Sequence, residues 1–156
     1  MEPDEQLTPA LGEARKRRRT LHDALVHLEM AISSPAAGRV PEWSTQVRKD
    51  LIGVRDAFEQ HVEATEKPDG LYDEIMERAP RLAHTVDRLR EEHPPITASI
   101  AGTIERMDAD EVVRDDWPVD QARDDLQRLI GGLVRHRQKG ADLVWEAYNV
   151  DIGGQA

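Results

Sequence analysis

The chain contains 156 residues, which is enough for one domain with a buried core. Charged residues make up 33% of it and aromatic residues only 4%, a composition that favours helices over sheets. The formal net charge of −10 disfavours binding to nucleic acid or anionic lipid through bulk charge, and the absence of cysteine excludes disulfides, thiolate metal sites and cysteine nucleophiles.

We expect the first eight residues to form a polar tail. Residues 1–6 are acidic and polar, and they lack the apolar run of a signal peptide. No apolar stretch elsewhere approaches the roughly 20 residues that a membrane-spanning helix needs. The sequence therefore predicts a cytoplasmic protein with no nucleic-acid partner and no membrane partner.

Helix-breaking residues divide the remaining chain into four long helical segments. Thr8 followed by Pro9 is typical of a helix start, because threonine caps the free N–H groups and proline fits the first helical position. Proline also opens each later segment, and turn-forming residues separate the segments. The predicted helices cover about residues 9–32, 41–66, 80–107 and 118–148.

Shorter segments join these helices. Residues 71–76 form a short amphipathic piece between the second and third helices, residues 108–117 an acidic loop, and residues 149–156 a C-terminal tail. The predicted fold class is therefore all-α, with one up-and-down antiparallel four-helix bundle over residues 9–148.

Each predicted helix carries one histidine on its apolar stripe, as judged from the helical period of about 100° per residue. A histidine in a bundle core needs a polar partner, and imidazole is a good ligand for iron, zinc and copper. His27 and His84 lie off the stripes and are expected at the surface. The four histidines expected to face the interior are His22, His61, His93 and His136.

The third helix carries Pro94-Pro95 directly after His93. Interior prolines remove backbone hydrogen bonds and cost about 3 kcal/mol each. The apolar phase nevertheless runs unbroken from Leu82 to Met107, which indicates one kinked helix rather than two. The bend is either a tolerated irregularity or a device that opens space beside His93.

The histidine-bearing segments resemble those of a known family. They are Leu21-His22-Asp23, Phe58-Glu59-Gln60-His61, Arg90-Glu91-Glu92-His93-Pro94-Pro95-Ile96 and Val134-Arg135-His136. They look like the four corresponding segments of the hemerythrin-like, HHE cation-binding family, and the similarity covers roughly residues 21–148. The resemblance implies an up-and-down four-helix bundle that holds a non-heme di-iron centre.

The sequence also departs from the family pattern at the second ligand of three helices. Thr65 and Thr97 stand four residues after His61 and His93, where the family has a glutamate and a histidine, and no carboxylate stands four or five residues after His136. Glu66, five residues after His61, reaches inward if the helix end unwinds. The metal ligands implied by the resemblance are thus His22, His61, His93, His136 and Glu66, which suits a mononuclear or asymmetric iron site better than a full two-metal centre.

Axial positions argue against convergence of all four histidines. His22 lies about 16 Å of helix before its loop and His61 about 30 Å after it, so a simple hairpin separates them by roughly two turns. His93 and His136 lie at more similar axial distances from the loop between their helices. Glu29 shares the face of His22 but lies two turns away.

Two functions of different kinds follow. The first is a hemerythrin-like protein that binds iron, with a small diatomic ligand, for oxygen, nitric oxide or redox sensing or for iron handling. The alternative is a metal-free four-helix module that has lost the di-iron site, keeps its histidines in a buried polar network with residues such as Thr65, Thr97 or Glu29, and binds a protein partner that the sequence does not name.

We do not expect conventional hydrolase or transferase chemistry, because no nucleophile–base arrangement or phosphate loop is present. Any activity is expected to be metal-dependent redox chemistry such as peroxide consumption. Residues 15–19, Arg-Lys-Arg-Arg-Arg, form a dense basic run that is either a solvated helix face or a patch for an acidic partner or phosphate.

Overall fold

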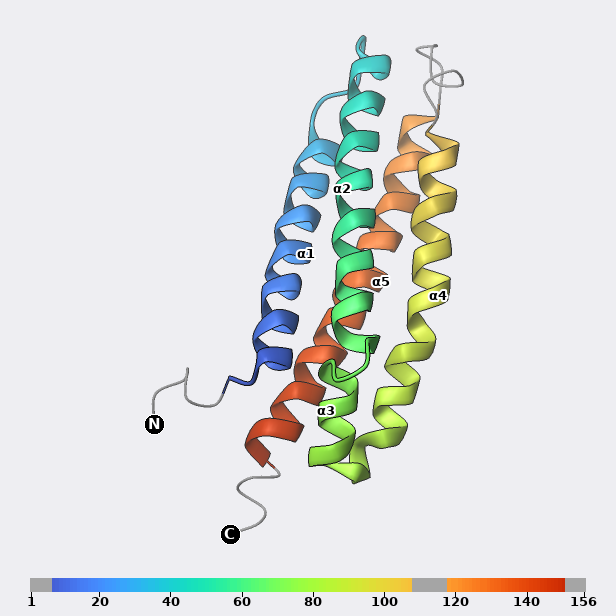
Figure 1. Ribbon diagram of the computed structural model, residues 1–156. Helices are drawn as coiled ribbons and strands as arrows, with labels where there is room; N and C mark the ends of the chain where they lie inside the picture. Colours follow the sequence, from blue (N-terminus) through green and yellow to red (C-terminus); the bar gives the residue numbers. More distant parts are fainter. Residues whose placement is uncertain (1–6, 108–117, 151–156) are drawn as a thin grey trace.

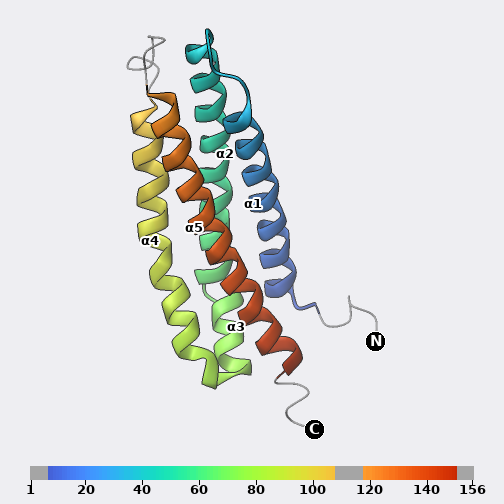
Figure 2. The same cartoon turned by 180° about the vertical axis from the view of Figure 1, so that it is seen from behind.

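Four long helices lie side by side, and the part of the chain that the computed structural model describes, residues 7–107 and 118–150, contains no strand (Figure 1). The helices are α1 (Pro9–Ser33), α2 (Val40–Glu66), α4 (Ala83–Arg106) and α5 (Val119–Trp145). Seen from behind, α5 lies between α1 and α4, with α2 on the far side (Figure 2). The all-helical prediction and the bounds of all four helices are confirmed to within a few residues.

Short elements complete the described chain. Helix α3 (Leu71–Arg78) and the 3-10 turn η2 (Pro80–Leu82) link α2 to α4, as predicted for the short amphipathic piece. A π-helical turn, η3 (Glu146–Val150), continues α5 two residues beyond the predicted end of the bundle. The predicted acidic loop at 108–117, and residues 1–6 and 151–156 of the predicted tails, lie outside the described residues. No helix among the described residues is both long and apolar enough to cross a membrane.

The start of α1 follows the sequence signal. The Thr8 hydroxyl accepts a hydrogen bond from the backbone N–H of Leu11 at 3.2 Å, and Pro9 occupies the first helical position. Helix α4 likewise continues through Pro94 and Pro95 as one element, and its two halves run in slightly different directions in Figure 1. Both prolines are exposed, so their rings lie on the outer side of the helix and leave the packing of its buried face undisturbed.

The turn between α2 and α3 depends on Gly70. A Cβ atom at this position would lie 2.8 Å from the backbone oxygens of both Ala64 and Lys67. The chain therefore folds closely back over the end of α2, and only glycine fits there. This turn brings Tyr72, two residues later, against the helices that carry the candidate site.

The core consists of two apolar clusters. One is centred on Trp43, Val47, Leu51 and Phe58 and includes Ile100 and Leu133. The other contains α3 and the neighbouring ends of the long helices, with members Leu11, Leu71, Tyr72, Ile75, Leu89 and Leu143. Along α4 and α5, one histidine stands between the members of the first cluster and those of the second, and His61 follows the last fully buried α2 member of the first cluster, Phe58. A polar layer therefore separates the two halves of the core.

Candidate metal centre

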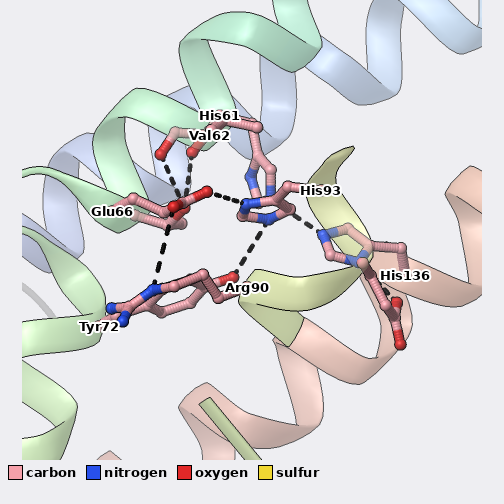
Figure 3. Close-up of polar contacts among 9 residues, drawn as sticks. His61, Val62, Glu66, Tyr72, Arg90, His93 and His136 are labelled. Carbon is pink, nitrogen blue, oxygen red and sulfur yellow. Dashed lines mark hydrogen bonds and ion pairs between the residues drawn. The ribbon is translucent and has the colours of Figure 1, made fainter. Parts of the chain in front are cut away.

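Three histidines from three different helices meet in this layer: His61 of α2, His93 of α4 and His136 of α5 (Figure 3). Each offers one ring nitrogen, and these nitrogens all lie within 4.8 Å of one another. His93 and His136 are each only 2% exposed, whereas His61 is partly exposed. The buried Phe58 ring lies 5.6 to 5.9 Å from the centroids of all three imidazoles and closes one side of the cluster.

His136 is oriented by a carboxylate of α4. Its Nδ1 lies 2.8 Å from Oε1 of Glu92, and Oε2 of Glu92 accepts a hydrogen bond of 2.8 Å from Lys139. Burial raises the pKa of Glu92, but the hydrogen bonds from Lys139 and His136 outweigh it, so the net effect is a lowered pKa. Because an ionised carboxylate only accepts hydrogen bonds, Nδ1 of His136 carries the proton. The lone pair of a neutral His136 ring is then on Nε2, which faces the cluster.

His93 has the same arrangement with a carboxylate from α2. Its Nδ1 lies 2.5 Å from Oε2 of Glu66, and its Nε2 lies 3.3 Å from the hydroxyl of Tyr72. The Tyr72 ring stacks on the imidazole with centroids 5.9 Å apart, and burial raises the pKa of this phenol. Burial lowers the pKa of His93, while the hydrogen bond to Glu66 opposes that shift. With Nδ1–H directed at Glu66, Nε2 of His93 is unprotonated and accepts a hydrogen bond from the Tyr72 hydroxyl, which a metal ion at Nε2 would displace.

His61 completes the set. Its Nε2 lies 3.3 Å from Nε2 of His136. Since the latter atom is an acceptor, His61 donates this hydrogen bond from an Nε2–H group. Burial, followed by repulsion from His93 and His136, lowers the pKa of His61 to about 3, so its ring is neutral near pH 7.

The geometry suits one metal ion. Two ligands with metal–nitrogen bonds of about 2.0–2.1 Å are separated by about 3.3–3.4 Å in a tetrahedral site and by about 2.9 Å in an octahedral one. The 3.3 Å between the Nε2 atoms of His61 and His136 matches the tetrahedral value, so a metal that replaces the Nε2 proton of His61 fits this pair, while the set as a whole lies within 4.8 Å and closes up on binding. The Nδ1 atoms of His93 and His136 face carboxylates, the outer partners that hold metal-binding histidines in the correct tautomer. Three protein ligands leave at least one coordination position for an exogenous ligand.

His22 does not join this cluster, and the expectation that it faces the interior is wrong. It is exposed, and its Nδ1 lies 2.6 Å from a guanidinium nitrogen of Arg137. The buried face of α1 is formed instead by Leu21, Leu25 and Leu28, one position away around the helix.

The predicted mismatch in axial level also explains why His22 is left out. The α1 residues that line the same cavity as His61 are Leu11, Ala14, Arg15 and Arg18, about one to three turns before His22. Glu29 is exposed as well and does not belong to the group of potential metal ligands.

Glu66 lies at the site, but behind a ligand rather than among the clustered nitrogens. It is the last residue of α2, and its carboxylate reaches His93 without unwinding of the helix. Of the two threonines considered as network partners, Thr65 donates to the backbone oxygens of His61 and Val62, and Thr97 is exposed. His27 and His84 are exposed, as predicted.

Sequence reasoning missed Glu92, Lys139 and Tyr72. Glu92 stands immediately before His93 in the chain but orients His136, which is 44 residues away. The spacing of residues within α4 does not show which helix packs against Glu92, so only the packing of α4 against α5 reveals this contact. Tyr72 had a weak signal, since it lies two residues after the glycine turn that ends α2.

Comparison of the chain with protein-family models, with curated proteins and with solved structures gave no significant match. The functional argument therefore rests on the geometry of the histidine layer.

Proposed function

We propose that this protein is an up-and-down four-helix bundle that binds a single first-row metal ion through His61, His93 and His136. The observation that carries the proposal is the meeting of three ring nitrogens, from three helices, within 4.8 Å of one another. Glu66 and Glu92 act from outside the ligand set by holding the tautomers of His93 and His136. His22 takes no part.

Iron is the metal we propose, in the cytoplasm, for a hemerythrin-like role in sensing or handling oxygen, nitric oxide or redox state. Three imidazoles suit iron, zinc and copper alike, so the choice of iron rests on the resemblance of the histidine segments to the hemerythrin-like family. A bound iron ion would supply redox chemistry and an open position for a small ligand.

The protein supports this role with a confined space next to the ligands. A cavity of about 40 Å³ adjoins His61, His136, Thr65 and Tyr72. A single water needs about 10–15 Å³ measured in this way, so the cavity has room for a ligand of two or three heavy atoms. Peroxide consumption by the iron form is an activity compatible with these dimensions.

Metal stoichiometry tests the proposal. We expect about one equivalent of iron per chain in protein produced with iron, and less than about one-tenth in the His93→Gln, His136→Gln double variant, because three-ligand sites do not survive loss of two ligands. His84→Gln is the matched control, since this exposed histidine lies on α4 and contacts none of the clustered rings. A wild-type protein that retains no iron, zinc or copper after loading and desalting would refute metal binding.

The rival function is a metal-free module that binds a protein partner. One observation favours it: the three imidazoles, Tyr72 and the two carboxylates already satisfy one another by hydrogen bonds. Under this rival, loading with metal leaves the thermal unfolding midpoint unchanged and gives no bound metal in either the wild type or the double variant.

A further inference from the structure

The basic run of α1 forms a cationic patch with α5. The patch consists of Arg15, Arg18 and Arg19 of α1 and Arg137 of α5, which surround an open depression that His22 and Asp23 also line. Within the described residues, none of these four arginines forms an ion pair with a carboxylate. This is unusual in a chain of net charge −10, in which acidic partners are plentiful.

The patch keeps a net positive charge, because four arginines and a single carboxylate, Asp23, line it and the contacts among them do not cancel the charge of the guanidinium groups. A guanidinium nitrogen of Arg137 lies 2.6 Å from Nδ1 of His22, and a neutral imidazole accepts a hydrogen bond without cancelling charge. Burial and then repulsion from Arg137 and Arg15 lower the pKa of Arg18. An anion placed among these groups relieves that repulsion.

The patch is continuous with the histidine site. Arg15, Arg18 and Arg137 line not only the open depression but also the 40 Å³ cavity that reaches His61 and His136. The positive groups therefore stand at the mouth of the cavity, and the candidate metal ligands stand at its inner end. A low-dielectric channel with one sign of charge at its mouth concentrates ions of the opposite sign.

We propose that this cationic patch is the entrance through which a small inorganic anion, of two or three heavy atoms, reaches the metal. This inference rests on the proposed metal site and adds the class of its exogenous ligand, an anion rather than only a neutral diatomic molecule. The size limit comes from the cavity, and the charge preference comes from four guanidinium groups that have no carboxylate partner within the described residues.

The test measures azide binding to the ferric protein by stopped-flow absorbance at low and high ionic strength, after the iron content of each sample has been determined. In the Arg18→Gln, Arg137→Gln double variant we expect the association rate to fall about tenfold at low ionic strength and to lose most of its salt dependence. The matched control is Arg55→Gln, Arg128→Gln, which removes the same charge from arginines that are paired with Asp56 and Asp125 outside the patch.

Two further measurements separate charge from shape. The Arg18→Lys, Arg137→Lys variant retains the charge and should restore the azide rate. Nitric oxide is neutral, so its binding to the ferrous protein should be equal in all variants.

The outcomes separate this inference from the proposed function. Full iron content with an azide rate that matches the control overturns the entrance and leaves the metal site intact. Failure of the wild type to retain iron overturns both. A double variant that loses iron while the control keeps it shows that the arginines retain the metal rather than admit the ligand, which also overturns the entrance.

Discussion

At the scale of single residues, the site depends on which nitrogen of each ring carries a proton. Glu92 and Glu66 each face an Nδ1 atom, so Nε2 is left unprotonated in both rings, facing His61 in the case of His136 and the Tyr72 hydroxyl in the case of His93. His61 remains neutral because its ring is surrounded by apolar atoms and two other imidazoles. The chain thus holds three imidazoles in place with both carboxylates outside the ligand set.

Replacing Glu92 by glutamine tests this outer support. The amide no longer imposes Nδ1–H on His136 and no longer carries the negative charge that pairs with Lys139, so we expect metal affinity to fall about 10–100-fold. Competition with a chelator of known affinity measures the change. Glu91→Gln is the control, because this neighbouring residue is exposed, has the same charge and is expected to leave affinity unchanged. Equal losses in the two variants would argue against a specific role of Glu92.

The low pKa of His61 predicts acid-sensitive stability of the metal-free protein. Between about pH 6.5, where histidine titrates in an unfolded chain, and about pH 3, the unfolded state binds a proton that the folded state does not. The free energy of unfolding is therefore highest above pH 6.5 and falls as the pH drops, by at most about 1.4 kcal/mol per pH unit from this group.

Urea unfolding in the presence of EDTA, between pH 7.5 and 4.5, measures this slope. His61→Gln should flatten it, while His84→Gln should not. A His61→Gln protein that loses stability with acid as steeply as the wild type would show that His61 is not the source of the effect.

At the scale of elements, helix ends and turns place the site residues. The close turn at Gly70 is the most demanding of them. We expect Gly70→Ala to lower the free energy of unfolding by about 1–3 kcal/mol, because the added methyl group overlaps the backbone oxygens of Ala64 and Lys67. Gly53→Ala, within α2 and with no heavy atom near the added carbon, should instead raise it by about 1 kcal/mol. Urea unfolding of both variants checks the opposite signs, and equal signs would contradict this account of the turn.

The helices were predictable from sequence because prolines and capping residues mark their starts locally, as Thr8 and Pro9 do for α1. The faces of α2 and α5 were predictable too, since His61 and His136 follow long aliphatic stripes. The buried face of α1 was not predictable, because its apolar residues are compatible with two helix faces that differ by one position. The face that is buried contains Leu21, Leu25 and Leu28, and His22 lies outside it. Contacts between helices, such as Glu92 with His136, have no local signal at all.

At the scale of the whole molecule, the proposed metal joins three helices and leaves the fourth out. The ligands come from α2, α4 and α5, whereas α1 contributes only Leu11, Ala14 and two arginines to the neighbouring cavity. Metal binding should therefore stabilise α2, α4 and α5 near the site more than it stabilises α1. Hydrogen exchange measured with and without metal checks this distribution. Increased protection centred on α1 would contradict the assignment of ligands.

The polar layer between the two apolar clusters restricts how the helices can align along one another. Aliphatic residues in a bundle tolerate the sliding of one helix along its neighbour, because leucine packs against leucine in several alignments. A slide of one turn, about 5.4 Å, would break the contacts of His136 with Glu92 and of His93 with Glu66 at once. These contacts lock α5 to α4 and α4 to α2 in one register, so the histidine layer selects a single alignment of three helices even before any metal binds.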